Sequence, residues 1–146
     1  MLFFIFLTIL FSFEALGLSE CGSKNKKNCL LEFQKQSVLI NELNINKKPL
    51  IPCSLDPITG LFRDGYCRYD SSDRGRHLVC AEVTSEFLKY TKTKGNDLST
   101  PNPRYNFEGL RPGDRWCLCV TRVEDANREG IPLRVLREAT NIKSGF

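Results

Sequence analysis

The sequence predicts an α+β fold, a small two-layer sandwich in which helices cover one face of a mixed or antiparallel sheet. Three observations lead to this prediction. The chain has 146 residues, 41% hydrophobic and 26% charged, which suits one ordinary globular domain. Helical periodicity is confined to short stretches, and strand-like segments lie between them. The two kinds do not alternate regularly, as a parallel sheet built from βαβ units would require.

The N-terminus differs in composition from the rest of the chain. Residues 1–13, MLFFIFLTILFSF, are an apolar run, and Ala15, Leu16 and Gly17 form the small-x-small pattern of a signal-peptidase site. The run is shorter than the roughly 20 apolar residues of a membrane span. We therefore expect a signal peptide over 1–17, a secreted protein and no stable membrane span. The alternative is a buried or interfacial N-terminal helix on a cytoplasmic protein.

A polar leader over 18–36 and one α+β domain over 37–146 are expected to follow. Lysine and arginine total 21 against 17 acidic residues, a net charge of +4, and the two signs are interleaved. No clustered basic stripe marks a phosphate-binding surface, so we expect no nucleic-acid partner. Composition does not set the oligomeric state. The seven cysteines are an odd number, so at least one lacks a partner within the chain.

The elements of the domain are predicted in chain order. Turn signals at Asp56-Pro57, Thr59-Gly60 and Asp64-Gly65 flank a short strand around 61–63. The best helix contains Cys80, Val83, Phe87 and Tyr90 at helical spacing, and it ends at Gly95 after Lys92 and Lys94. A long loop over 96–114 follows. Then RWCLCVTRV (115–123) is a strand, EDANREG (124–130) a helix, and PLRVLREAT (132–140) a second strand.

Three long segments carry a resemblance to a known family. PCSLDPITGLFRDGYC, HLVCAEVTSEFLKYTKTKGNDLSTPNP and GLRPGDRWCLC together resemble the family known as domain of unknown function 2237, over about Ser37 to Thr140. The resemblance implies a compact two-layer α+β fold and brings no known activity. The bacterial relatives look cytosolic, and similar chains continue past the C-terminal EATNIKSGF, which leaves a truncated C-terminus open.

The resemblance also bears on the cysteines. Disulfides are rare in cytosolic proteins, so the five cysteines shared with the family are expected to be thiols, ligands or buried packing. They are Cys53, Cys67, Cys80, Cys117 and Cys119.

Strand alternation constrains the RWCLCV segment. It places Trp116, Leu118 and Val120 on a core face and Cys117 and Cys119 on the opposite face. Residues two apart on a strand have Cα atoms roughly 6.6 Å apart with parallel Cβ vectors. A disulfide between these two cysteines is therefore not expected.

Cysteine chemistry gives one functional hypothesis. Cys80 is placed at the first turn of the predicted helix, where the dipole favours a reactive thiol, and His77 is available as its base. Asp73, Asp97 or Asp114 could orient the imidazole. Zinc is a second version of this hypothesis, with Cys117, Cys119, Cys80 and His77 as ligands, although no C-x-x-C pair occurs. Buried cysteines that act as small hydrophobes are the alternative to both.

The long polar loop gives the leading hypothesis, a small binding domain for a polar or anionic small molecule. Its pocket would be made by the 96–100 loop and the 111–119 turn and strand. The expected binding residues are Asn96, Asp97, Ser99, Thr100, Arg111, Asp114 and Arg115. The alternatives are a self-capped loop, in which Asp97 and Ser99 bond their own backbone, and the cysteine-dependent enzyme or zinc protein described above.

Overall fold

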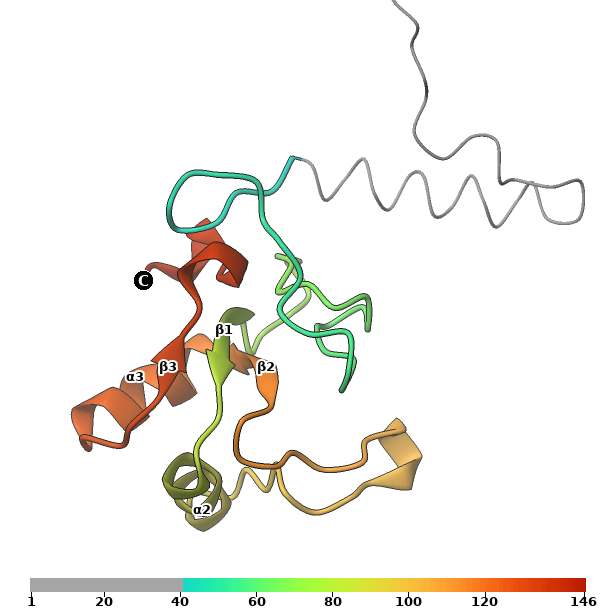
Figure 1. Cartoon of the computed structure of the whole chain (residues 1–146), viewed down its shortest axis with the longest axis vertical. Helices are drawn as coiled ribbons and strands as arrows, with labels where there is room; N and C mark the ends of the chain where they lie inside the picture. The colour runs from blue at the N-terminus through green and yellow to red at the C-terminus, as the bar shows by residue number, and fades with distance from the viewer. Residues whose placement is uncertain (1–40) are drawn as a thin grey trace, which may run out of the picture. The chain divides into compact units, whose positions relative to one another are not determined.

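A computed structural model describes residues 41–146 of the chain (Figure 1). The signal peptide expected over 1–17 and the leader expected over 18–36 lie outside the described residues. No helix within residues 41–146 is long and apolar enough to cross a membrane. The helices and strands are β1 (His77–Glu82), α2 (Ser85–Thr93), β2 (Arg115–Cys119), α3 (Val120–Arg128) and β3 (Arg134–Val135), with 3-10 turns η1 (Pro103–Tyr105), η2 (Arg137–Ala139) and η3 (Ile142–Ser144).

The three strands form one antiparallel sheet in the order β2-β1-β3. In the β1–β2 ladder Cys80 lies opposite Cys117, and Ala81 lies opposite Trp116. Residues that face each other across a ladder share a face of the sheet, so one face carries the two cysteines and the other carries the larger apolar side chains. The predicted α+β class is confirmed, with the sheet in its antiparallel form.

Both helices contribute to the core on the apolar face. Phe87 and Leu88 from α2, and Val123 and Ala126 from α3, are buried together with Trp116 and its neighbours on the strands. This confirms Trp116 as a core residue, as alternation along its strand predicted. Burying each large apolar side chain contributes about 1.5–3 kcal/mol, which is the main force that holds the helices on the sheet.

The end of α2 is as predicted, and its beginning is not. The side chain of Thr84 caps the helix by accepting the N–H of Phe87, and Gly95 follows the last turn with a positive φ of 78°. Cys80 therefore belongs to β1 and not to the helix. Four consecutive residues of β1 are buried, so its period of two is hidden and the apolar spacing imitates a helix.

Three other predicted elements need correction. Residues 61–63 form a turn and not a strand, because the positive φ of Arg63 (51°) and of both flanking glycines bends the chain back. The strand that begins at Arg115 ends at Cys119, and α3 begins at Val120, four residues before the predicted helix. Of the second strand expected over 132–140, only two residues pair as β3 before the chain turns into η2.

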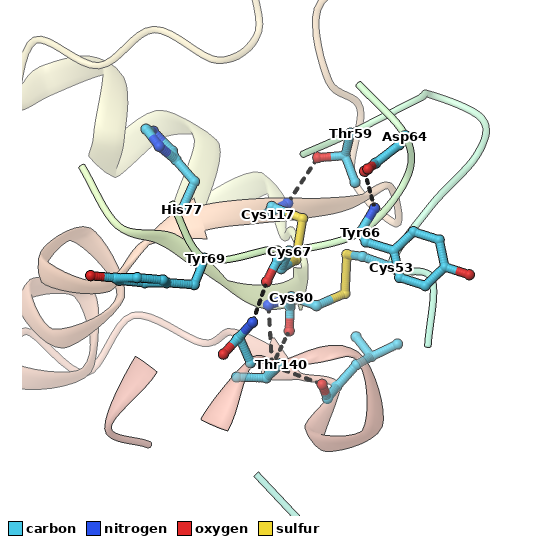
Figure 2. The surroundings of a disulfide bond; sticks show 12 residues. Cys53, Thr59, Asp64, Tyr66, Cys67, Tyr69, His77, Cys80, Cys117 and Thr140 are labelled. Carbon is cyan, nitrogen blue, oxygen red and sulfur yellow. Dashed lines mark hydrogen bonds between the residues drawn. A yellow bond between two sulfur atoms is a disulfide. The ribbon is translucent and has the colours of Figure 1, made fainter. Parts of the chain in front are cut away.

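The face of the sheet opposite the helices is covered by residues 53–67, here called the 53–67 loop. Two disulfides, Cys53–Cys80 and Cys67–Cys117, join the two ends of this loop to β1 and β2 (Figure 2). Between them the hydroxyl of Thr59 accepts the N–H of Cys117 at 3.0 Å. The loop therefore provides a hydrogen-bond acceptor for a backbone N–H of the edge strand β2, and it also covers the face that carries the cysteines.

The disulfides overturn the expectation that these four cysteines are thiols, ligands or buried packing. Cys80 and Cys117 are partners in the ladder and point to the same face, where the 53–67 loop supplies one cysteine to each. Each bond joins residues far apart in sequence, by 27 and 50 positions. Local spacing cannot reveal such pairs. The two cysteines of β2 are not bonded to each other, as their separation predicted, and Cys119 is the free cysteine of residues 41–146.

Removing the Cys67–Cys117 bond should destabilise the protein. A cross-link between residues 50 positions apart reduces the entropy of the unfolded chain. This stabilises the folded state by about 2–4 kcal/mol. We expect the double variant C67A/C117A to lose that much free energy of unfolding in urea titrations. The control is C119A, which removes a sulfur but no cross-link and should lose about 1 kcal/mol. Equal losses would contradict the role given to the cross-link.

Candidate functional site

The free cysteine lies beside the only histidine of the chain. Cys119 ends β2 and is the N-cap residue of α3, and His77 begins β1 directly opposite it in the ladder. The Sγ atom of Cys119 lies 3.0 Å from Nε2 of His77. The register of β1 is shifted between His77 and Val79, and such irregularities re-aim side chains at strand ends. The cysteine and the imidazole are thus held by two neighbouring strands.

Asp73 holds the other side of the imidazole. Its Oδ1 lies 2.8 Å from Nδ1 of His77, and its Oδ2 accepts the backbone N–H of the same residue at 2.7 Å. The Asp73 side chain is 4% exposed, whereas the His77 side chain is 40% exposed. A buried carboxylate with two hydrogen bonds to one residue fixes both the position and the orientation of the ring. Asp73, His77 and Cys119 therefore form a continuous array, here called the Asp73–His77–Cys119 triad.

The contacts within the triad set its charges. The hydrogen bond with the Cys119 sulfur raises the pKa of His77 to about 9, against its partial burial, and Asp73 adds to the increase. Burial alone would raise the pKa of Asp73, but hydrogen bonds from the backbone and ring of His77 hold it below its ordinary value. Near neutral pH the ring is therefore an imidazolium, and it donates to the carboxylate on one side and to sulfur on the other.

Gly75 leaves the space that the triad occupies. A Cβ atom at this position would lie 2.5 Å from Cε1 of His77 and 3.1 Å from Sγ of Cys119. The backbone N–H of Gly75 also donates to Oδ1 of Asp73 at 3.2 Å. Any larger residue would push the imidazole away from the sulfur. Glycine is therefore needed at this position because it has no side chain, and not because of its backbone conformation.

A pocket of about 200 Å³ lies beside His77. Its walls come from the turn of the 53–67 loop, from the start of β2 and from His77. The lining residues are Gly60, Leu61, Arg63, His77, Trp116 and Cys117. Cys119 is not among the lining residues; it is partly exposed and its sulfur contacts the ring of His77, which is one of them.

The structure changes the partners expected for His77. Cys80, the expected nucleophile, is fully buried, and its sulfur is bonded to Cys53, so it offers no thiol. His77 contacts Cys119 in its place, and Asp73 is the one of the three proposed aspartates that holds the ring. Sequence spacing favoured a neighbour three residues away. Strand pairing brings together residues 42 positions apart, a contact that only the correct register would have revealed.

The expected zinc ligands are not assembled as proposed. The sulfurs of Cys53, Cys67 and Cys117 lie within 4.8 Å of one another, but all three are in disulfides and carry no thiolate charge. Cys80 and Cys117, which belong to the proposed ligand set, cannot bind a metal as thiolates because each is in a disulfide. Within residues 41–146 the proposed set keeps only the thiol of Cys119 and one ring nitrogen of His77, whereas structural zinc takes four ligands.

The 96–100 loop satisfies its own polar groups. Oδ1 of Asp97 accepts the N–H groups of Ser99 and Thr100 at 2.9 and 3.0 Å, and Oδ2 contacts the Thr100 hydroxyl and Lys92. The Thr100 hydroxyl and then the Lys92 ammonium hold the pKa of Asp97 well below its ordinary value. This is the self-capped arrangement that the sequence left open. Asn96 donates its backbone N–H to the carbonyl of Thr91 at the end of α2.

Residues 111–115 also form hydrogen bonds among themselves. The N–H of Arg111 donates to Oδ2 of Asp114 at 2.7 Å, and the N–H of Asp114 donates to the carbonyl of Arg111. Arg115 is exposed at the start of β2. The pocket beside His77 is lined by none of the seven residues expected to bind a ligand. We therefore place the candidate site at the triad.

The comparisons with known proteins agree with the resemblance seen in the sequence. The model of a family described as "Uncharacterized protein conserved in bacteria (DUF2237)" matches residues 43–144. This range contains all the residues of the triad and of the pocket. A search of curated proteins found no match.

The single histidine allows a direct test of the triad. In a proton NMR titration of the full chain, the Cε1–H signal of His77 should titrate with a midpoint of about 9. The C119A variant removes the largest cause of this shift, so its midpoint should fall toward the ordinary value of 6.5. D73N should also lower the midpoint, and R104M, on an exposed 3-10 turn, should leave it unchanged. A midpoint near 6.5 in the unaltered chain would contradict the triad.

The same shift predicts a pH dependence of stability. A folded-state pKa above the unfolded one means that the stabilisation is complete below about 6.5 and is lost as pH rises through about 9. We expect the difference in free energy of unfolding between the unaltered chain and H77N to shrink over this interval. Urea titrations at several pH values measure it. Because His77 is substantially exposed, the effect should be small, and a difference that grows with pH would contradict the assignment.

Proposed function

The chain belongs to the DUF2237 family. We propose that it is a cysteine-dependent catalyst of acyl transfer or hydrolysis, with Cys119 as the nucleophile. The observation that carries the proposal is the Asp73–His77–Cys119 triad, with contacts of 2.8 and 3.0 Å on the two sides of one imidazole. A nucleophile in contact with a base, and a base held by a third group, is the arrangement that nucleophilic catalysis needs.

Two features of the fold favour the charged form of the nucleophile. The imidazolium of His77 lies in contact with the sulfur, and α3 begins at the residue that follows Cys119. Thiolates are stabilised both by adjacent cations and by the positive end of a helix dipole. No side chain caps this helix start, so the dipole is not already balanced by a capping carboxylate or hydroxyl. The thiolate is the nucleophilic form of cysteine.

The reaction follows from the positions of these groups. The sulfur of Cys119 attacks a carbonyl carbon and forms a thioester, and the leaving group takes a proton from Nε2 of His77 as its bond to the acyl carbon breaks. The ring, now neutral, removes a proton from water, and the resulting hydroxide attacks the thioester. The acid leaves, and the sulfur returns to its starting form. Asp73 touches neither reactant and is a positioning residue.

The proposal combines the two hypotheses that the sequence supported. It retains a pocket for a small molecule, now formed by the 53–67 loop and β2 in place of the 96–100 loop. It retains a cysteine enzyme, now with Cys119 in place of Cys80. The presence of His77 in the lining of the pocket supports a substrate at this position.

The proposal is tested by the reactivity of Cys119. We expect iodoacetamide to label Cys119 at least about tenfold faster in the folded than in the urea-unfolded chain, because only the folded chain holds the imidazole and the helix start against the sulfur. Mass mapping of peptides identifies the labelled cysteine. H77N should abolish the difference, and G75A should reduce it by displacing the ring.

Activity is measured with 4-nitrophenyl acetate, which reports acyl transfer by release of nitrophenolate. C119S should abolish the enzymatic rate, and H77N should lower it by about a hundredfold or more. D73N should lower it less, and R104M should leave it unchanged. The proposal fails if Cys119 reacts at the rate of an unfolded thiol and that rate is the same in H77N.

A further inference from the structure

One side of the pocket carries a cation that no acidic group of the described residues neutralises. The guanidinium of Arg63 lies 5.0 Å from the ring centroid of Trp116, and both residues line the pocket that reaches His77. Its one hydrogen bond within residues 41–146 is from Nη1 to the carbonyl of Ile58 at 3.2 Å. A guanidinium has five N–H donors, so most of its capacity to bind an anion remains available.

The carboxylates nearest in sequence and in the site are already engaged. Asp64 accepts the N–H of Tyr66 and forms an ion pair with Arg68 at 2.8 Å. Both carboxylate oxygens of Asp73 are hydrogen-bonded to His77. Arg63 forms no ion pair among residues 41–146, and the residues that line the pocket include no Asp or Glu, so its guanidinium is the cation of the lining that has no acidic partner.

The turn that carries Arg63 is held in a conformation that ordinary residues rarely adopt. Arg63 has a φ of 51°, and its N–H donates to the carbonyl of Gly60 at 3.1 Å. A Cβ atom on Gly60 would lie 2.3 Å from the carbonyl oxygen of Tyr66, so the turn closes tightly only with glycine there. A non-glycine residue at positive φ is strained, so the surrounding hydrogen bonds must hold it in place. The arginine is thereby presented over Trp116 by a fixed turn.

From these observations we propose that Arg63, stacked on Trp116, is a subsite for the carboxylate of a small acyl compound whose reactive carbon is turned toward His77 and Cys119. Arginine binds carboxylates by two parallel hydrogen bonds, which orients a ligand as well as attracting it. The apolar side chains of Leu61 and Trp116 suit the carbon skeleton of such a compound. A pocket of about 200 Å³ limits the ligand to a small molecule.

This inference rests on the proposed function for the reaction, and its test separates the two. Iodoacetate and iodoacetamide alkylate a thiolate by the same displacement, in which an S–C bond forms and iodide leaves, but only iodoacetate carries a carboxylate. The ratio of their rates at Cys119 therefore measures recognition of the carboxylate, while the iodoacetamide rate measures the reactivity of the thiol. Both are read by mass mapping of the full chain.

We expect R63M to lower the iodoacetate rate about fourfold, the effect of one unit charge at about 5 Å in water, and to leave the iodoacetamide rate unchanged. R63K should retain part of the preference, and added salt should weaken it in the unaltered chain. R104M removes another exposed arginine, outside the pocket, and should keep the ratio.

The outcomes are distinct. A ratio that is the same in R63M and in the unaltered chain, with rapid iodoacetamide labelling intact, overturns the carboxylate subsite and leaves the proposed function standing. Slow iodoacetamide labelling that does not depend on His77 overturns the proposed function. In that case a ratio that still falls in R63M supports the subsite as an anion-binding site without the reaction.

Discussion

The two disulfides between the 53–67 loop and the central strands are the constraint on which the rest of this structure depends. The loop has no helix and no strand of its own, and its cysteines are bonded to Cys80 and Cys117, which face each other across the β1–β2 ladder. Together with the bond from Cys117 to Thr59, these cross-links hold an irregular segment against the sheet. That segment supplies half of the pocket wall.

The same ladder explains why one cysteine remains free and where it lies. Cys117 and Cys119 point to the same face, but the 53–67 loop covers only the first of them with a partner. Cys119 lies two residues after Cys117, where β2 ends and α3 begins. There it contacts His77, the first residue of the neighbouring strand β1. A buried disulfide and an accessible thiol thus follow from two positions on one strand. We propose the position at the strand end as the nucleophile, because it keeps a thiol, is partly exposed and lies at a helix start.

The proposed site brings together groups whose charges support one another. Asp73 stabilises the imidazolium, and the imidazolium stabilises a negative sulfur. Arg63 adds a second positive charge to the lining of the pocket, held at a fixed position by its turn. The triad suits the activation of a thiol, and the arginine suits the choice of an anionic ligand. The two parts are independent in structure, because one depends on strand pairing and the other on the 53–67 loop.

The sequence by itself determined the α+β class, the end of α2 at Gly95, the core face of Trp116 and the family, because these depend on composition and on patterns within a few residues. Only the tertiary structure decided which cysteines bond, which one stays free and which one meets His77. These depend on the register of β1 against β2 and on the path of the 53–67 loop. Contacts between residues 27 to 50 positions apart leave no local pattern, so spacing pointed to Cys80 where strand pairing selects Cys119.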